Sequence, residues 1–199
     1  MGLILFTGAA LLVWSFVIEP DRVIVKEATI NIPQWPQAFD HLRVVLISDL
    51  HVGSPHIDIE KLREIVATIN QQQPDLILIA GDFVIQDVLG GHFVEPEPIA
   101  AELKNLRARD GVYAVLGNHD WWYDGNRVML ALNNAGIKIL ENDVARIERD
   151  DQSVWIAGLA DLWTGKPNIT GTLAKIPASA MVVALTHNPD LFPKLPTSV

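Results

Sequence analysis

Short apolar runs that end in polar, metal-binding residues constrain this chain more than any other feature. The run from Val44 to Ile47 leads into Asp49 and His51, and Gly53 follows. A short apolar run closed by glycine predicts a strand buried on both faces. Side chains two residues apart on an extended chain point the same way, so Asp49 and His51 should face one point beyond the strand end. Open α/β sheets usually place their sites there.

The same pattern recurs three times along the chain. Residues 75–80 (DLILIA) lead into Gly81-Asp82, residues 112–116 into Gly117-Asn118-His119-Asp120, and residues 181–185 into Thr186-His187. Further strands are expected at residues 22–32, 137–140 and 153–159, and helices at about 98–108 and 126–134. Another helix should begin after Asp58, a capping residue, and end before Pro74. Alternating strands and helices predict an α/β domain whose polar strand ends gather at one edge.

Ionisable groups gathered at one edge repel each other or stay unpaired unless a counter-ion is present. A carboxylate beside an imidazole suits Mn, Fe or Zn better than Ca. A carboxylate placed between two cations can bridge them, and such a pair, about 3.5–4 Å apart, can clamp a phosphate for attack. Taken singly, Asp82 could be a turn residue, Asn118 could occupy a left-handed turn, and His187 could be a loop histidine.

The ordered set resembles the calcineurin-like metallophosphoesterase family. The residues that carry the resemblance are Asp49-x-His51, Gly81-Asp82, Gly117-Asn118-His119-Asp120 and His187. The stretches LRVVLISDLHVG, GNHDWW, DLWTGKPN and LTHNPDLFPKLP resemble the membrane-associated, YkuE/YaeI-like bacterial phosphodiesterase branch of that family. The resemblance implies a four-layer α-β-β-α sandwich and two divalent ions, Mn, Fe, Zn or Mg, with Mn favoured.

The resemblance also implies a role for each residue. Asp49 and His51 would bind the first ion, Asp82 would bridge both ions, and Asn118 and His187 would bind the second. His119 would face the substrate and protonate the leaving oxygen, a role that suits an imidazole titrating near neutral pH. The nucleophile would be a hydroxide that bridges the ions. Trp121 and Trp122 would wall the substrate pocket or pack in the core, and Trp163 is a further candidate for the same role.

Two departures from the family pattern stand out. Many members carry an Asp three residues after the bridging one, where it orients the catalytic histidine; here that position is Ile85, and Asp87 or Asp120 could substitute. The family pattern also continues into a strand and a Gly-His-x-His motif that supplies one ligand to each ion. The sequence ends at Val199 before such a motif. We therefore expect a C-terminally incomplete domain with weak or no activity.

The amino-terminal segment differs in kind from the rest. Gly2 to Ile18 contain no charged residue. As a helix they would span about 26 Å, the short limit for a bilayer core of about 30 Å. We expect residues 1–19 to form a membrane anchor or uncleaved signal, and residues 22–199 to form the metallophosphoesterase domain. By resemblance the anchor would lie in a bacterial inner membrane, on a side that the flanking charges leave open. The alternative is a buried core helix or strand pair.

Composition narrows the partners. The net charge of −9 argues against a nucleic-acid binder, which would present a basic face. Bound cations invert the local sign, so a phosphoester substrate, including a lipid-linked one, remains compatible. With no cysteine there is no disulfide and no thiolate zinc site. Together with the resemblance, these observations leave three hypotheses. The first is a membrane-anchored, two-metal phosphodiesterase or phosphatase. The second is a UDP-2,3-diacylglucosamine pyrophosphatase of lipid A synthesis, and the third is an inactive, truncated metal-binding domain.

Overall fold

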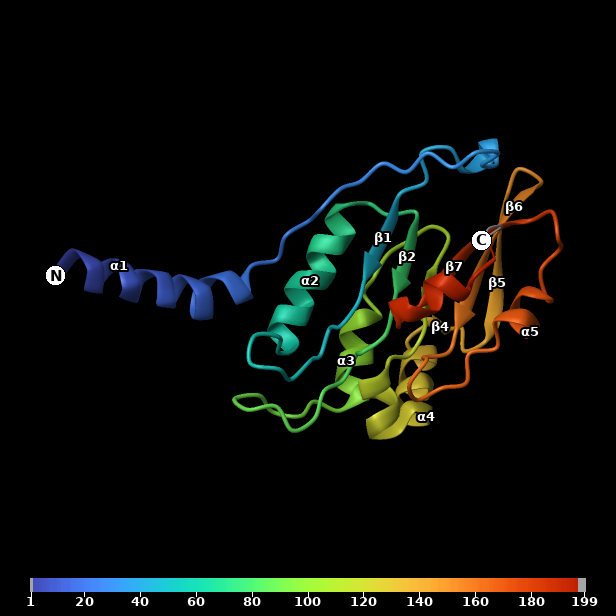
Figure 1. Cartoon of the computed structure of the whole chain (residues 1–199). Coiled ribbons are helices and arrows are strands. Elements are labelled where there is room, and N and C mark those ends of the chain that lie inside the picture. The colour runs from blue at the N-terminus through green and yellow to red at the C-terminus, as the bar shows by residue number, and fades with distance from the viewer. Residues whose placement is uncertain (1, 197–199) are drawn as a thin grey trace. The chain divides into compact units, whose positions relative to one another are not determined.

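The computed structural model describes residues 2–196 in two units, one up to Asn31 and the other from Ile32 onward (Figure 1). Residues 1 and 197–199, at the outer ends of the predicted anchor and domain, lie outside the described residues.

The first unit is an exposed apolar helix followed by extended chain. Helix α1 (Gly2–Val13) continues as a π-helical turn (Trp14–Ile18) and a 3₁₀ turn (Glu19–Asp21). By length and composition this segment is able to cross a membrane, and it is the one such helix within residues 2–196. The strand predicted at residues 22–32 is wrong, because no strand forms there. The segment alternates partly between apolar and polar residues, but no neighbouring strand of the described residues takes up its backbone hydrogen bonds.

The second unit begins with a parallel sheet crossed by helices. Strands β1 (Val44–Ile47), β2 (Leu76–Ile79), β3 (Val112–Ala114) and β4 (Lys138–Ile139) lie in chain order. All three pairings are parallel, so their carboxyl ends meet at one edge. The connecting helices are α2 (Ile59–Gln71), α3 (Pro96–Leu103) and α4 (Asn118–Asn134), and a 3₁₀ turn (Gln37–Phe39) precedes β1. Asp58 caps α2 as predicted, since its side chain accepts a 2.8 Å hydrogen bond from the amide of Lys61.

A second sheet holds β5 (Asp143–Arg149), β6 (Gln152–Leu159) and β7 (Met181–Thr186). The β5–β6 pair is an antiparallel hairpin that turns at Asp150 and Asp151, both with positive φ, while β6 and β7 are parallel. Helix α5 (Ile169–Leu173) lies between β6 and β7 in sequence, and a 3₁₀ helix (Pro189–Lys194) follows β7. Neither β5 nor α5 was expected from the sequence.

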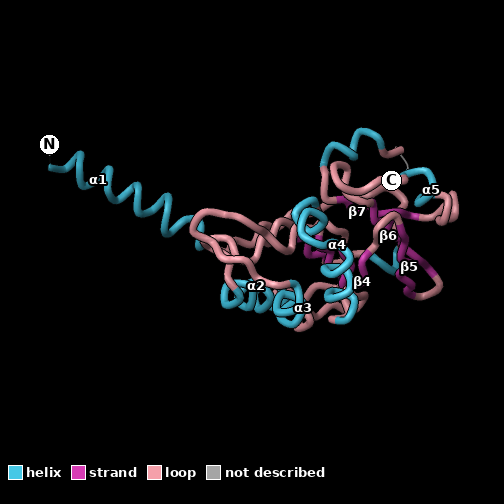
Figure 2. The backbone as a smooth tube through the Cα atoms, turned by 90° about the horizontal axis from the view of Figure 1, so that it is seen from below, coloured by secondary structure: helices cyan, strands magenta, loops and turns pink. Residues whose placement is uncertain are grey.

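Two cores result from the alternation of side chains along the strands. Ile77 and Ile79 of β2 point to the helices, where they pack with residues such as Leu62 of α2. The intervening side chains of β2 point to the second sheet and pack with Val154 and Ile156 of β6. Figure 2 shows α2 and α3 on the side of the molecule away from β5, β6 and β7. The α/β fold class is confirmed; the outer helical layer consists of the short α5, which contacts β6.

Strand β1 differs from the prediction on one face. Val45 and Ile47 pack against the helical core, but Val44 and Leu46 are 44% and 64% exposed. Their register partners on β2, Leu76 and Leu78, are buried. The inter-sheet core therefore ends at β2, and β1 is buried on one side only.

Candidate metal centre

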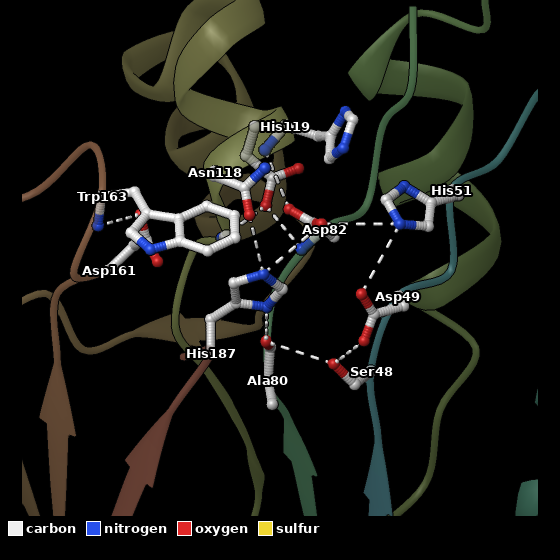
Figure 3. A network of polar contacts seen from close by, with 12 residues as sticks. Ser48, Asp49, His51, Ala80, Asp82, Asn118, His119, Asp161, Trp163 and His187 are labelled. Carbon is white, nitrogen blue, oxygen red and sulfur yellow. Dashed lines mark hydrogen bonds and ion pairs between the residues drawn. The ribbon is translucent and has the colours of Figure 1, made fainter. Parts of the chain in front are cut away.

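The strand ends bring the predicted ligands together from both sheets. Asp49 and His51 follow β1, Asp82 follows β2, and Asn118 is the first residue of α4, close after β3. His187 arrives from the second sheet, directly after β7. Its Nδ1 lies 2.7 Å from the carbonyl oxygen of Ala80, just beyond the end of β2, and this contact joins the two sheets at the site (Figure 3).

The potential ligand atoms form two overlapping groups that share Asp82. His51, Asp82 and His119 offer atoms within 4.8 Å of one another, and so do Asp49, Asp82 and His187. The Nε2 atom of His51 lies 3.5 Å from an Asp49 oxygen and 3.5 Å from Asp82 Oδ2. The Nε2 atom of His187 lies 3.4 Å from Asp82 Oδ2 and 3.1 Å from Asn118 Oδ1.

These separations suit the donor set of a divalent cation. Ligand atoms held at about 2.0–2.1 Å from a tetrahedral ion lie about 3.4 Å apart. Asp82 is 2% exposed, and burial raises its pKa despite the opposing effect of His187. A buried carboxylate of this kind needs positive charge beside it to stay ionised. The residues therefore fit a divalent cation beside Asp82, which has His51 at 3.5 Å and His187 at 3.4 Å from the same carboxylate oxygen.

The backbone at the site is held in an unfavourable conformation. The backbone is left-handed at three of these residues, with φ values of 54° at Asp49, 42° at His51 and 60° at Asp82. Residues other than glycine rarely adopt this conformation. Such strain persists where the surroundings fix it, and it is concentrated at functional sites. Gly81 has a φ of 89°, and a Cβ there would lie 2.4 Å from the amide nitrogen of Gly117. The loops after β2 and β3 can therefore touch only because residue 81 is glycine.

Asp120 joins the same two loops. This side chain is fully buried, and its Oδ2 accepts hydrogen bonds of 2.9 Å from the amides of both Asp82 and Gly117. Its Oδ1 accepts from the amides of Phe83 (2.8 Å) and Val84 (3.2 Å). Burial raises the pKa of Asp120 to about 7, while the amide donors lower it. Asp120 therefore fixes the backbone on which the central carboxylate is mounted.

His119 lies beside His51 and is partly buried. Its amide donates a 2.9 Å hydrogen bond to Asp82 Oδ1, and its ring packs edge-on against His51 at 4.8 Å and against Trp122 at 4.7 Å. Burial lowers the pKa of its imidazole. Asp87 and Asp120 were the residues predicted to orient the catalytic histidine. The side chain of Asp120 accepts hydrogen bonds from backbone amides, and Asp87 lies on an exposed loop.

The two tryptophans after His119 point in different directions. Trp121 packs against the helical core and against Gly125, where an added Cβ would lie 2.3 Å from its ring. Trp122 is 58% exposed beside His119. The sequence predicted only the second part of α4, at residues 126–134. The helix is divided by non-helical backbone at Asp124, whose side chain caps that second part. The first part, which carries the two tryptophans, was not predicted.

A family model of the calcineurin-like phosphoesterases matches residues 42–190. The chain belongs to the calcineurin-like phosphoesterase family. The family uses divalent metals, for which the residues around Asp82 are the candidates in this chain.

Relatives support the assignment. The chain is 32% identical over 175 residues to the uncharacterized metallophosphoesterase YkuE of Bacillus subtilis, covering 87% of this chain and 60% of YkuE. It is 31% identical over 164 residues to a Danio rerio transmembrane protein with a metallophosphoesterase domain, covering 80% of this chain and 36% of that protein. The chain thus spans less than two thirds of either relative. The solved structure of Haemophilus influenzae NAD nucleotidase shares the fold, with a TM-score of 0.51 at 15% identity over 77% of this chain and 35% of that one.

Asp82→Asn should abolish tight binding of Mn²⁺, because it removes the charge common to both ligand groups. Isothermal titration calorimetry on the full chain would measure this, with affinity falling by at least the 10–100-fold typical of lost supporting groups. Asp87→Asn on the exposed loop is the matched control and should bind as the wild type does. Equal Mn²⁺ affinity in Asp82→Asn and the wild type would refute the role of Asp82.

Asp120→Asn should weaken metal binding without removing a ligand. An amide in place of the carboxylate turns an NH₂ group toward backbone N–H donors, which leaves amides unsatisfied at a cost of about 1–3 kcal/mol. The midpoint temperature of thermal unfolding should fall, and the Mn²⁺ affinity measured by titration should fall with it. Asp151→Asn, at the exposed β5–β6 turn, makes the same change of charge and should shift neither.

Proposed function

We propose that the chain forms the catalytic core of a phosphodiesterase that uses two divalent ions, with Mn²⁺ favoured. Asp49 and His51 would hold one ion, Asn118 and His187 the other, and Asp82 both. The observation that carries the proposal is the position of Asp82 Oδ2, 3.5 Å from the Nε2 atom of His51 and 3.4 Å from that of His187. Ions bound there would activate water and neutralise phosphate charge.

The protein's own groups would act around that centre. His119 would donate a proton to the leaving oxygen, since its partly exposed ring stands beside His51 at the cluster. Burial lowers its pKa, so the protonated form gives up its proton more readily. The amide of His119 is fixed on Asp82, which ties the position of the acid to that of the central carboxylate. No side chain would form a covalent intermediate.

His119→Asn should reduce kcat for diesters with poor leaving groups by about 10²–10⁴-fold, the usual contribution of a general acid. Bis(4-nitrophenyl) phosphate, which has a good leaving group, should be affected less. Mn²⁺ affinity should stay within a few-fold of the wild type. Equal losses for good and poor leaving groups would contradict the role of proton donor, and no Mn²⁺-dependent hydrolysis by the wild type would contradict the proposed reaction.

The apolar helix favours a membrane-bound setting for this reaction. We infer that the segment Gly2–Asp21 anchors the domain to a membrane, because it is exposed and, as a helix, is long and apolar enough to cross a bilayer. A lipid-linked substrate such as UDP-2,3-diacylglucosamine is the second candidate that this helix supports. Release of UMP from that compound would distinguish it from a general diester.

Leu11→Lys together with Leu5→Lys should release the full chain from membranes into the soluble fraction. A lysine at the centre of a spanning helix disfavours insertion by about 2.5–3.5 kcal/mol. Fractionation and alkaline extraction of expressing cells would measure the distribution. Lys substitution at Leu89, an exposed loop residue of the other unit, is the control and should leave the chain on the membrane. A wild-type chain that is extracted by alkali would contradict an integral anchor.

A further inference from the structure

The loop between β6 and α5 presents an exposed indole at the metal centre. Trp163 is 67% exposed, and in Figure 3 its ring projects from the loop toward Asn118 and His187. The sheet register explains this placement. In the parallel pair β6–β7, Leu159 lies opposite Thr186, so the loop after β6 and the ligand His187 leave the second sheet at the same edge.

A buried carboxylate fixes the backbone that carries this ring. Asp161 is fully buried, and its Oδ2 accepts hydrogen bonds of 2.9 Å from the amides of Trp163 and Thr164 and of 2.8 Å from the Thr164 hydroxyl. The carbonyl of Asp161 accepts a further bond from the amide of Gly165. The turn at residues 161–165 is thus closed on itself around one side chain.

Asn142 fixes the base of the same loop. Its Oδ1 accepts hydrogen bonds from the amides of Asn168 (2.8 Å) and Ala160 (3.4 Å), and its Nδ2 donates to the carbonyl of Lys166 (2.8 Å). The side chain of Trp163 is therefore exposed while its backbone is restrained at both ends. A binding group held in this way loses little conformational entropy when a ligand arrives.

The ring itself is free to take a partner. Trp122 packs against His119, whereas no aromatic ring of the described residues packs on Trp163. An indole with an open face stacks on planar aromatic groups, and nucleobases are bound in this way without sequence-specific contacts.

We propose that Trp163 forms a subsite for a planar aromatic group, an aryl ring or a nucleobase, attached to the phosphodiester at the metal centre. This rests on the proposed function, and it assigns Trp163 as a specificity-determining residue. The phosphate would lie at the Asp82 cluster, and the group on the Asn118–His187 side would stack on the indole.

Two diesters with the same leaving group test the subsite. The 4-nitrophenyl leaving group would lie on the His119 side in both. On the other side, where the subsite would lie, thymidine 5′-(4-nitrophenyl phosphate) carries a base and methyl 4-nitrophenyl phosphate carries only a methyl group. In the full chain with Mn²⁺, Trp163→Ala should lower kcat/KM for the thymidine diester about tenfold, mainly through KM, and leave the methyl diester nearly unchanged. Trp163→Phe should keep most of the preference and Trp163→Leu should lose it. Leu130→Ala, at an exposed position of α4, is the control and should change neither substrate.

The outcomes separate the two proposals. Equal losses on both diesters, or an unchanged preference in Trp163→Ala, would overturn the subsite while leaving the phosphodiesterase intact. If the wild type hydrolyses neither diester, the proposed function fails, and calorimetry with thymidine 5′-phosphate and methyl phosphate in Mn²⁺ decides the subsite. Tighter binding of the thymidine compound that Trp163→Ala removes would support it, and equal binding by both proteins would overturn it.

Discussion

The whole site depends on hydrogen bonds that join the loop after β2 to the loop after β3. Two buried carboxylates, Asp82 and Asp120, accept these bonds from backbone amides. Asp120 accepts from the amide of Asp82, and Asp82 accepts from the amide of His119, which adjoins Asp120. Each loop thus holds the other through the residue that it contributes. Because the loops begin at adjacent parallel strands, the sheet sets their separation and the carboxylates set their conformation. The carboxylate that a metal would meet is consequently mounted on backbone that both loops restrain.

Much of this arrangement follows from the sequence. Apolar runs that end in Asp49, Asp82 and Asn118 predict parallel strands with polar carboxyl ends, and the structure brings these residues to one edge. The family, the α/β class and the cap at Asp58 were likewise readable, because each depends on neighbours in sequence. The hypothesis that the domain is incomplete stays a prediction, because it concerns residues after Val199.

Other features depend on contacts that no local pattern reveals. β5 is a strand because its Ile147 reaches the inter-sheet core, although Arg146 and Glu148 beside it are charged. The sequence indicated Asp120 only as a possible partner of the catalytic histidine. Three of its four amide donors belong to residues 82–84, which are 36 to 38 positions away in the sequence. Trp163 gains its position from the pairing of β6 with β7, and the restraint by Asn142 reaches across 18 to 26 residues. In each case tertiary structure, not propensity, decides.

Strand β7 ends the second sheet, so one side of its backbone has no strand partner within residues 2–196. Its sequence, MVVALT, is uncharged and rich in residues that favour extended chain. Together with the exposed Val44 and Leu46 of β1, this edge offers a template for pairing between molecules. The net charge of −9 opposes such encounters through mutual repulsion, which salt screens. Association of the 199-residue chain through this edge should therefore depend on ionic strength.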